Sequence, residues 1–364
     1  MENSTKEIIE LTKELIKFKT TKENPTEIKK CMSFIKKYFS KCDVIIKEFE
    51  HKGKLSLFIS YKETKKPKLL LNGHIDVVAA DGDQYTPKIK NNKLYGRGSA
   101  DMKAGVATYI VLMKEFLEKK PDMGLMIVSD EEMGGFDGTN YLINDKDFEA
   151  EFVLGAEPNH VDSLDKLNIT TSEKGVLWLK ITTLGKSCHA SRPWLGDNAL
   201  EKLIERYEEI KKLFPKTTEK NRWKTTINLS KINVDNPTNR VPDKAEMVLD
   251  IRYTAGMPKK EILDKIKKIK DIKIEILEHG QMLINDENLE TIKKLKSCIE
   301  KTTGKECKLL KEHGSSDLRF TSEKKIPSVI FGPYGENYHG KDEFVSIESL
   351  NLFYKVMKEF ISTF

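Results

Sequence analysis

The sequence predicts an α/β protein in which a larger domain, with a mixed central sheet flanked by helices, contains a smaller ferredoxin-like insertion. The length of 364 residues suits two domains better than one. Short, continuously apolar segments alternate with helical segments near the N-terminus, which is typical of a sheet buried on both faces. From about residue 174 to residue 279 the pattern changes to β-α-β-β-α-β, which indicates a separate folding unit.

The larger domain is predicted in two parts, residues 1–174 and 282–364, and the inserted domain covers residues 175–281. Two amphipathic helices are expected between residues 4 and 40, because Asn24-Pro25-Thr26-Glu27 supplies a turn and a helix start. The other elements expected in this domain are strands at 44–49, 55–61, 69–71, 125–128 and 328–331, a helix at 104–119 and a last helix from Ile347.

The inserted domain has a regular pattern of its own. Residues 176–183 alternate in polarity like a strand, and residues 198–214 have the apolar spacing of a helix. The elements expected after these two are strands at 225–234 and 245–254, a helix at 259–269 and a strand at 272–278.

Composition argues against nucleic-acid and membrane partners. Lys plus Arg number 63 and Asp plus Glu 57, so the net charge is only +6. The lysines lie on amphipathic segments such as 202–212 and 259–270, which we interpret as solvated helix faces. No apolar segment is long enough to span a membrane, and residues 1–19 have the pattern of a helix rather than a signal peptide. The five cysteines form no CxxC pair, so we expect reduced thiols and a cytoplasmic location.

The first segment that could carry chemistry is an apolar strand ending in Asn72-Gly73-His74-Ile75-Asp76. Residues two apart on a strand point the same way, so Asp76 can approach His74 and fix the tautomer of its imidazole. Taken alone, a histidine at a strand end is more often a hydrogen-bonded surface group.

The second segment is rich in glycine and contains Gly96, Gly98, Asp101 and Gly105 before a predicted helix. Gly96-x-Gly98 could begin a phosphate-binding loop. However, Asp101 stands where a dinucleotide-binding motif has its third glycine, and the Walker spacing is absent. A carboxylate at that position would repel phosphate, so we reject a nucleotide site.

In the third segment an apolar strand runs into Asp130, Glu131 and Glu132. Three adjacent carboxylates repel one another unless cations or hydrogen-bond donors compensate them. Neighbouring strand residues face opposite ways, so one of Glu131 and Glu132 can bind a metal ion while the other serves as a general base. The alternative is an acidic surface turn.

Two further segments place a carboxylate and a histidine after strands. Glu157 follows an apolar strand at 152–154, and His339 lies in a glycine-rich loop at 332–340. Strand ends are where open α/β sheets bind ligands. Two histidines and several carboxylates, without a thiolate, suit zinc, cobalt or manganese. A carboxylate that bridges two metal ions is a recurring arrangement in hydrolases.

Five motifs, taken in this order, resemble those of a di-zinc amidohydrolase and metallopeptidase family. They are NGHID, GRGSADMKAG, SDEEMGG, GAEP and YHG. That family includes acetylornithine deacetylase, succinyl-diaminopimelate desuccinylase, aminoacylase and glutamate carboxypeptidase. The insertion is similar to the family's lid and dimerisation domain, so the resemblance covers essentially the whole chain. It implies a catalytic domain, a lid and a homodimer.

The resemblance also implies a role for each of the candidate residues in these motifs. His74 and Glu157 would bind one metal ion, Glu132 and His339 the other, and Asp101 would bridge the two. Asp76 would orient His74. Glu131 would be the general base that takes a proton from the bridging water and passes it to the leaving amine.

Within the insertion, Cys188-His189-Ala190-Ser191-Arg192-Pro193 is similar to the family's HxSxP turn. The resemblance implies that His189 donates to the oxyanion in the partner subunit's site. Cys188 is either a passive small residue or an oxidation-sensitive thiol. The positions that resemble substrate-binding segments are Asn239, Arg252, Gly314 and Ser315, although Arg252 could instead form a surface ion pair.

The leading hypothesis is hydrolysis of the amide bond of an N-acyl amino acid, of the deacetylase or desuccinylase type, by a hydroxide bridging two divalent metal ions. A dipeptidase or carboxypeptidase of the same family would differ only in its pocket. Cocatalytic aminopeptidases outside the family share the ligand order but lack the insertion. A non-catalytic binding protein would have lost the base or a ligand, but the base Glu131 and all five ligand positions are filled here.

Overall fold

The computed structural model describes residues 3–158 and 167–364, which belong to two compact units. Unit 1 is formed by Met1–Ser172, Ile284–Leu310 and Ser316–Phe364, and unit 2 by Glu173–Leu283 and Lys311–Ser315. The insertion expected at 175–281 lies inside unit 2. Each unit has its own apolar core.

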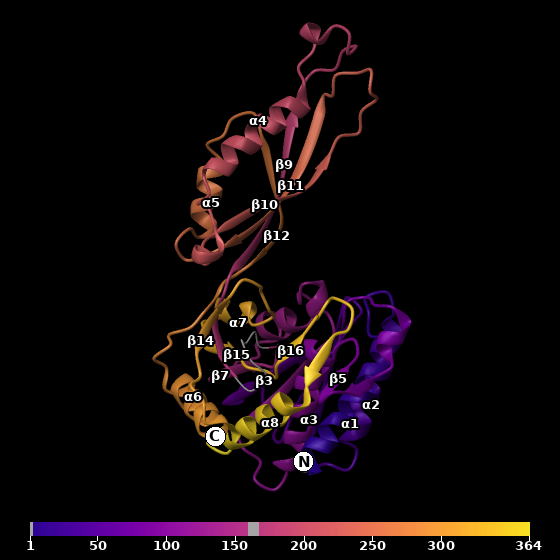
Figure 1. The fold of residues 1–364 in the computed structure, drawn as a ribbon, viewed down its shortest axis with the longest axis vertical. Helices are drawn as coiled ribbons and strands as arrows, with labels where there is room; N and C mark the ends of the chain where they lie inside the picture. Colours follow the sequence, from indigo (N-terminus) through magenta and orange to yellow (C-terminus); the bar gives the residue numbers. More distant parts are fainter. Residues whose placement is uncertain (1–2, 159–166) are drawn as a thin grey trace. The chain divides into compact units, whose positions relative to one another are not determined.

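Unit 1 is built on a nine-stranded mixed sheet (Figure 1). Its strand order is β1-β2-β6-β3-β7-β15-β8-β13, with β14 paired to β8. The central strand β3 runs parallel to both β6 and β7, and β7 runs parallel to β15. The bounds are β1 Ile45–His51, β2 Lys54–Ser60, β3 Leu69–His74, β6 Met123–Val128, β7 Phe152–Gly155, β8 Ile169–Glu173, β13 Leu283–Ile284, β14 Leu309–Glu312 and β15 Ser328–Ile330.

Helices flank this sheet, and the predicted α/β class with a mixed central sheet is confirmed. Every residue of β3 and β6 is buried, as their continuous apolar sequences predict. The helices are α1 Asn3–Lys17, α2 Pro25–Tyr38, α3 Ala104–Glu115, α6 Glu290–Thr303, α7 Arg319–Glu323 and α8 Ile347–Ile361.

A second, smaller sheet of unit 1 has the order β16-β17-β5-β4. Its strands are β4 Lys88–Lys90, β5 Lys93–Tyr95, β16 Gly335–Glu336 and β17 Phe344–Ser346. The sequence patterns did not predict it, because segments of two or three residues show no periodicity. Pairing of Phe344 with Tyr95 brings the chain on either side of His339 next to the glycine-rich segment that carries Asp101.

Unit 2 has a four-stranded antiparallel sheet of order β10-β11-β9-β12. Its core side chains come from the sheet and from two helices. The first of these helices is capped by Asn198, whose side chain accepts hydrogen bonds from the backbone N–H groups of Leu200 and Glu201. The elements in chain order are β9 Gly175–Leu184, α4 Ala199–Lys212, β10 Thr226–Asn233, β11 Lys244–Tyr253, α5 Lys259–Ile266 and β12 Lys273–Gly280.

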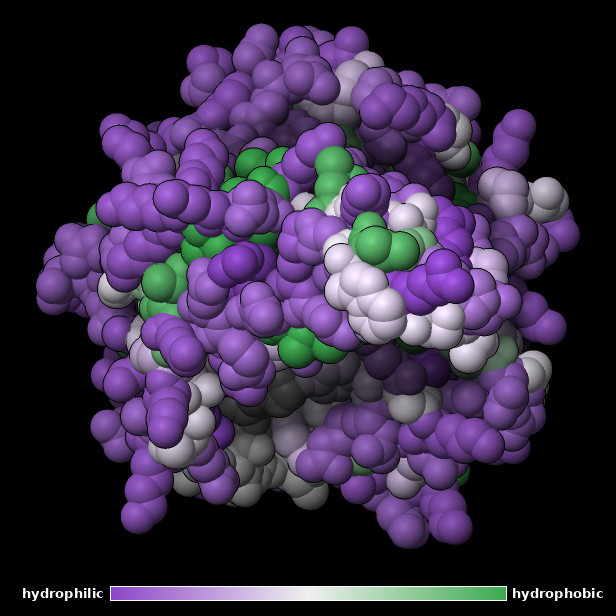
Figure 2. Space-filling view, turned by 90° about the horizontal axis from the view of Figure 1, so that it is seen from above, coloured by the Kyte–Doolittle hydropathy of each residue, from purple (hydrophilic) through white to green (hydrophobic). Residues whose placement is uncertain are grey.

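The face seen in Figure 2 is largely hydrophilic, with a few apolar patches. In unit 2 the exposed large apolar side chains include Trp194 and Leu195 of a short 3₁₀ helix, Ile204 of α4 and Ile232 of β10. Within the described part of the chain, none of the helices combines the length and apolar character needed to cross a bilayer.

Candidate active site

His74 and Glu157 come together because β3 and β7 are parallel neighbours. Carboxyl ends of parallel strands meet at one edge of a sheet, and His74 is the last residue of β3 while Glu157 follows β7 by two positions. His74 Nε2 lies 3.5 Å from Glu157 Oε1 and 3.1 Å from Asp101 Oδ1. The ligand atoms of these three side chains all lie within 4.8 Å of one another.

Asp101 takes part in a second cluster through its other oxygen. Its Oδ2 lies 3.3 Å from His339 Nε2, and the same nitrogen lies 3.1 Å from Glu132 Oε2. Glu132 belongs to a short 3₁₀ helix, Glu131–Met133, that begins shortly after β6 ends. The ligand atoms of Asp101, Glu132 and His339 again lie within 4.8 Å of one another. Asp101 is therefore common to both clusters.

The contacts of Asp76 differ in detail from the expected one. His74 Nδ1 lies 3.0 Å from the backbone carbonyl oxygen of Asp76 and 3.5 Å from its carboxylate Oδ1. The carboxylate Oδ2 instead accepts from the backbone N–H of Glu132 at 3.0 Å. Asp76 thus contacts the imidazole through its backbone and the Glu132 turn through its side chain, so it connects the two clusters.

Carboxylates crowd this site, and their protonation is perturbed accordingly. Burial raises the pKa of Glu157 to about 8, with a further contribution from Asp101 and an opposing one from His74. Hydrogen bonds to Asp101 and Glu132 are the largest causes that raise the pKa of His339 to about 10. Without a metal ion, protons on the two histidines and on Glu157 therefore offset the repulsion among the carboxylates.

These residues fit a pair of divalent cations. Cations would replace the protons as the compensating charge, and imidazole nitrogens with carboxylate oxygens are donors that zinc, cobalt and manganese accept. Two clusters joined by one carboxylate are also the arrangement in which two metal ions lie side by side.

Glu131 stands apart from both clusters although it is adjacent to Glu132. Burial raises the pKa of its carboxyl well above the usual range, and Glu157, Asp317 and Asp101 raise it further while His74 lowers it. The charges of the clusters therefore act on the carboxyl of Glu131, although neither cluster of the described residues includes it.

Sequence reasoning missed a buried charged pair behind Asp101. The carboxylate of Glu343 accepts from Arg97 Nη1 at 2.7 Å and from the backbone N–H of Asp101 at 3.1 Å. A signal existed, since Arg97 is a lone cation between two glycines in a motif that carries a ligand.

In unit 2, His189 and Asn239 lie on neighbouring loops. The two loops meet in a bridge between His189 and Arg240, and the N–H of Ala190 donates to the carbonyl of Asn239 at 2.9 Å. His189 is exposed, and its Nδ1 lies 2.8 Å from Ser191 Oγ. The His189 loop follows β9 and the Asn239 loop precedes β11, so both lie at the end of the sheet where Leu184 pairs with Lys244.

Arg252 lies at the opposite end of the same sheet, where it pairs with Val176 of β9. Between Lys244 and Arg252 the strand extends roughly 25–30 Å at about 3.4 Å per residue. Within one chain, His189 and Arg252 are therefore far apart. Arg252 Nε donates to Asp250 Oδ1 at 2.9 Å, so the ion pair considered as an alternative is present.

Gly314 and Ser315 belong to the short segment of unit 2 that begins at Lys311. The N–H of Lys174 donates to the carbonyl of Glu312 in this segment at 3.3 Å. Burial lowers the pKa of the Lys174 ammonium, and Arg252 lowers it further, which places two cations near one another at this end of unit 2. Lys174 is a second residue that sequence reasoning missed; a lysine just before a buried strand was the available signal.

Comparison with known proteins assigns the family. Residues 70–363 match the peptidase family M20/M25/M40. This range is most of the chain and contains Glu131 and the five residues expected to be metal ligands. The chain belongs to this family. The relation that the motif order predicted is thereby confirmed, and the M20 chain is a metal-dependent amidohydrolase or peptidase.

Relatives support this assignment over nearly the full length. The M20 chain is 28% identical to succinyl-diaminopimelate desuccinylase of Pelagibacter ubique, with 98% of each chain covered. It is 30% identical to a metallohydrolase of Methanocaldococcus jannaschii over 78% of this chain and 79% of that protein.

Solved structures share the fold at lower identity. A tripeptidase of Staphylococcus aureus superposes with a TM-score of 0.77 at 20% identity, covering 99% of this chain and 98% of the other. An M20 family metallo-carboxypeptidase of Sulfolobus solfataricus superposes with a TM-score of 0.76 at 19% identity, covering 99% of each chain.

Proposed function

We propose that this M20 chain hydrolyses the amide bond of N-acyl amino acids, in the manner of a deacetylase or desuccinylase. The observation that carries the proposal is the sharing of Asp101 between two clusters of histidine and carboxylate ligands. His74 and Glu157 would complete one cation site, and Glu132 and His339 the other. When bound, two divalent cations, zinc or else cobalt or manganese, would polarise the scissile carbonyl and acidify a water molecule.

Glu131 is the proposed general base. Its carboxylate takes a proton from the attacking water and passes it to the nitrogen of the leaving amine. Burial and the charges of Glu157 and Asp101 raise the pKa of this carboxyl, and bound cations would offset that rise so that it can act as a base. The ligand clusters are formed by other residues, which leaves Glu131 for this task. Asp76 supports the base and the ligands together by holding the backbone of Glu132.

An N-acyl amino acid and a dipeptide both carry a free carboxylate. The planar fork of Arg252 can bind such a group bidentately, and Lys174, Gly314 and Ser315 belong to the same end of unit 2. The relative named as a desuccinylase, which is matched over 98% of both chains, supports the acyl amino acid over the peptide.

Unit 2 is proposed to be a ferredoxin-like lid that also forms a homodimer. Its βαββαβ element order and antiparallel strand order support the fold. In a dimer, His189 of the partner subunit would donate to the oxyanion, together with the partner's Asn239 as a substrate contact. The separation of His189 from Arg252 along β11 supports a contribution from two chains.

The decisive experiment is a hydrolysis screen of the metal-supplemented protein. Its substrates are N-succinyl-diaminopimelate, N-acetylornithine, N-acetyl-lysine, other N-acyl amino acids and simple dipeptides. We expect turnover of an N-acyl amino acid, and we expect Glu131→Gln to reduce kcat by about 10²–10⁴-fold while its metal content stays unchanged. Cleavage of dipeptides alone would identify a dipeptidase instead. Full activity of metal-loaded Glu131→Gln would refute the assigned base.

A matched control is Glu115→Gln, the same chemical change at the last residue of α3. Glu115 accepts from Tyr354 Oη at 2.7 Å, and it lies about 17 Å along the helix from Ala104, at about 1.5 Å per residue. This variant should keep both metal content and turnover.

A further inference from the structure

The Glu343 carboxylate is buried behind the glycine-rich turn and accepts four hydrogen bonds from it. Arg97 Nη1 donates at 2.7 Å and the N–H of Gly98 at 2.9 Å to Oε2, while the N–H groups of Ala100 and Asp101 donate at 2.9 and 3.1 Å to Oε1. The side chain is only 1% exposed. One carboxylate therefore fixes the backbone on both sides of Ala100 and reaches the shared ligand itself.

The Arg97 guanidinium extends this connection to the loop of the other ligand. Its Nη2 donates to the carbonyl oxygen of Gly340 at 2.8 Å, one residue beyond His339. The backbone of Glu343 also accepts from the N–H of Gly96 at 3.0 Å. The two residues of the pair are 246 positions apart in the sequence, and together with the pairing of β5 and β17 they join the Asp101 turn to the His339 loop.

The His339 loop needs such a connection. The His339 side chain is 52% exposed, so packing alone does not fix its imidazole. Its backbone has a φ of +63°, in the left-handed region that is unfavourable for a residue with a Cβ. A backbone tether at Gly340 limits where this imidazole can lie relative to Asp101.

Local backbone geometry around Asp101 is adapted to the Glu343 carboxylate. Gly98 has a φ of +81°, and at this turn the N–H groups of Gly98, Ala100 and Asp101 point toward one acceptor. A Cβ at Gly98 would lie 2.8 Å from Val77 and 2.9 Å from Lys103. A glycine is therefore required at this turn.

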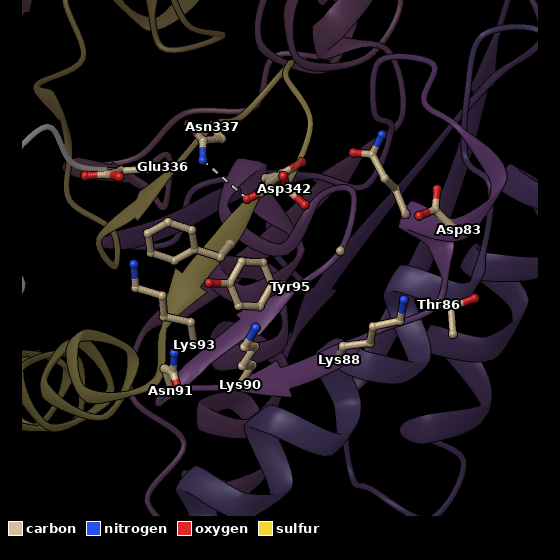
Figure 3. A pocket seen from close by; sticks show the side chains of 14 residues that line it. Asp83, Thr86, Lys88, Lys90, Asn91, Lys93, Tyr95, Glu336, Asn337 and Asp342 are labelled. Carbon is tan, nitrogen blue, oxygen red and sulfur yellow. Dashed lines mark hydrogen bonds between the residues drawn. The ribbon is translucent and has the colours of Figure 1, made fainter.

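The neighbouring surface is a cavity of about 580 Å³ over β4 and β5, seen in Figure 3. Its lining mixes Lys88, Lys90 and Lys93 with Asp83 and Asp342. Because both signs of charge are present, this cavity favours no particular ligand charge. The Glu343 pair, in contrast, has contacts that lead directly to two ligand residues.

We propose that Glu343 and Arg97 are positioning residues that hold the Asp101 turn and the His339 loop at the spacing required by the metal centre. The inference rests on the metal centre proposed above. A buried ion pair is weak evidence for a contribution to stability, because desolvation offsets much of its attraction. Because the pair is hydrogen-bonded to the segments that carry two of the proposed ligands, we expect it to affect metal affinity rather than stability.

The test is cation affinity, measured by chelator competition and by the visible absorption of the cobalt-loaded protein. Glu343→Gln keeps the shape but places an amide N–H₂ against the donors of Arg97 and Gly98. We expect it to weaken cobalt binding about 10- to 100-fold, the range found for residues that support metal ligands, with an altered cobalt spectrum. Arg97→Lys should weaken mainly the second cation equivalent, since it loosens Gly340 but leaves the N–H contacts of Asp101 in place.

The control Glu115→Gln should change neither affinity nor spectrum, whatever it does to Tm. Wild-type affinity and spectrum in Glu343→Gln would overturn the positioning role, even if Tm falls. If Glu343→Gln does not fold, Arg97→Lys decides by the same criterion. A wild-type protein that binds no cobalt would contradict the metal centre itself, so the two failures are distinguishable.

Discussion

The predicted site residues of unit 1 converge on one carboxylate, whereas those of unit 2 lie at opposite ends of a sheet. In unit 1, the ligand atoms of His74 and His339 both lie within 4.8 Å of Asp101 oxygens. In unit 2, His189 is on a loop beyond one end of β9, and Arg252 pairs with Val176 at the other end. The first group comes together within one chain, and the second agrees with the contribution from two chains proposed above.

The difference follows from how each group is held. Parallel pairing of β3 with β6 and β7 fixes where their ends lie, so residues just after these strands must meet. In unit 2, β11 runs antiparallel to β9, so the loop that follows β9 lies beside the start of β11, while Arg252 near the end of β11 lies beside the start of β9. The two groups should consequently respond differently to substitution.

The largest effect is expected for Asp101→Asn. Both clusters lose a negative ligand at once, so activity should fall by more than the roughly 10²–10⁴-fold attributed to a general base alone. Bound metal, measured by elemental analysis after gel filtration, should fall below that of wild type. Retention of two metal equivalents with wild-type turnover would show that the clusters are not the reactive centre.

The ligand clusters of unit 1 were predictable because strand ends carried them. The sequence placed His74 and Glu157 at the ends of apolar strands, where α/β sheets bind ligands. Asp101 was expected to join the two groups only because of the resemblance to the family. The Arg97–Glu343 pair was not predictable, since it depends on β5 pairing with β17. Strands of three residues have too few side chains to show a pattern, and no local rule joins segments so distant in the chain.

Contacts made through the backbone were also not predictable from the sequence. The sequence suggested the Asp76 side chain as the partner of His74, yet the backbone carbonyl of Asp76 is the nearer group at 3.0 Å. Side-chain patterns carry no information about which carbonyl faces an imidazole. The role of Asp76 as an orienting residue stays a prediction.

The second prediction concerns mixed dimers of Glu131→Gln and His189→Ala chains. His189→Ala alone should reduce kcat about 10²–10³-fold, the effect of removing one oxyanion donor. If the active site combines two subunits, half the sites of each mixed dimer contain neither substitution. Refolding an equal mixture should then restore about a quarter of wild-type activity, given random pairing of subunits. The measurement is kcat of the mixture against each variant alone.

If the mixture stays as inactive as its components, either His189 and Glu131 of one chain act in the same site or His189 takes no part in an active site. The control mixture pairs Glu131→Gln with Asp101→Asn. Both substitutions lie in unit 1, so no combination of these chains yields activity beyond that of the separate variants.

The third prediction tests Arg252, which could bind substrate or simply pair with Asp250. Arg252→Lys keeps the charge but loses the planar fork, so one charge-assisted hydrogen bond worth about 1.5–3 kcal/mol is lost. KM should therefore rise about 10- to 100-fold, with a smaller change in kcat. Arg206→Lys on α4 is a matched control, because Arg206 also pairs with a carboxylate, that of Glu209, within unit 2. An unchanged KM for Arg252→Lys would leave it as a structural partner of Asp250.

The smallest effect is expected for Cys188, next to His189. Its Sγ donates to the carbonyl of Arg192 at 3.3 Å, a contact that serine can replace, so Cys188→Ser should change kcat/KM by less than about twofold. The thiol is partly exposed, whereas burial raises the pKa of Cys31 and of Cys307 to about 12. Iodoacetamide at neutral pH should therefore label Cys188 well before those two, as peptide mass spectrometry would show. If labelling Cys188 abolishes activity while Cys188→Ser does not, the added group obstructs the loop of His189, which would make this loop part of the working site.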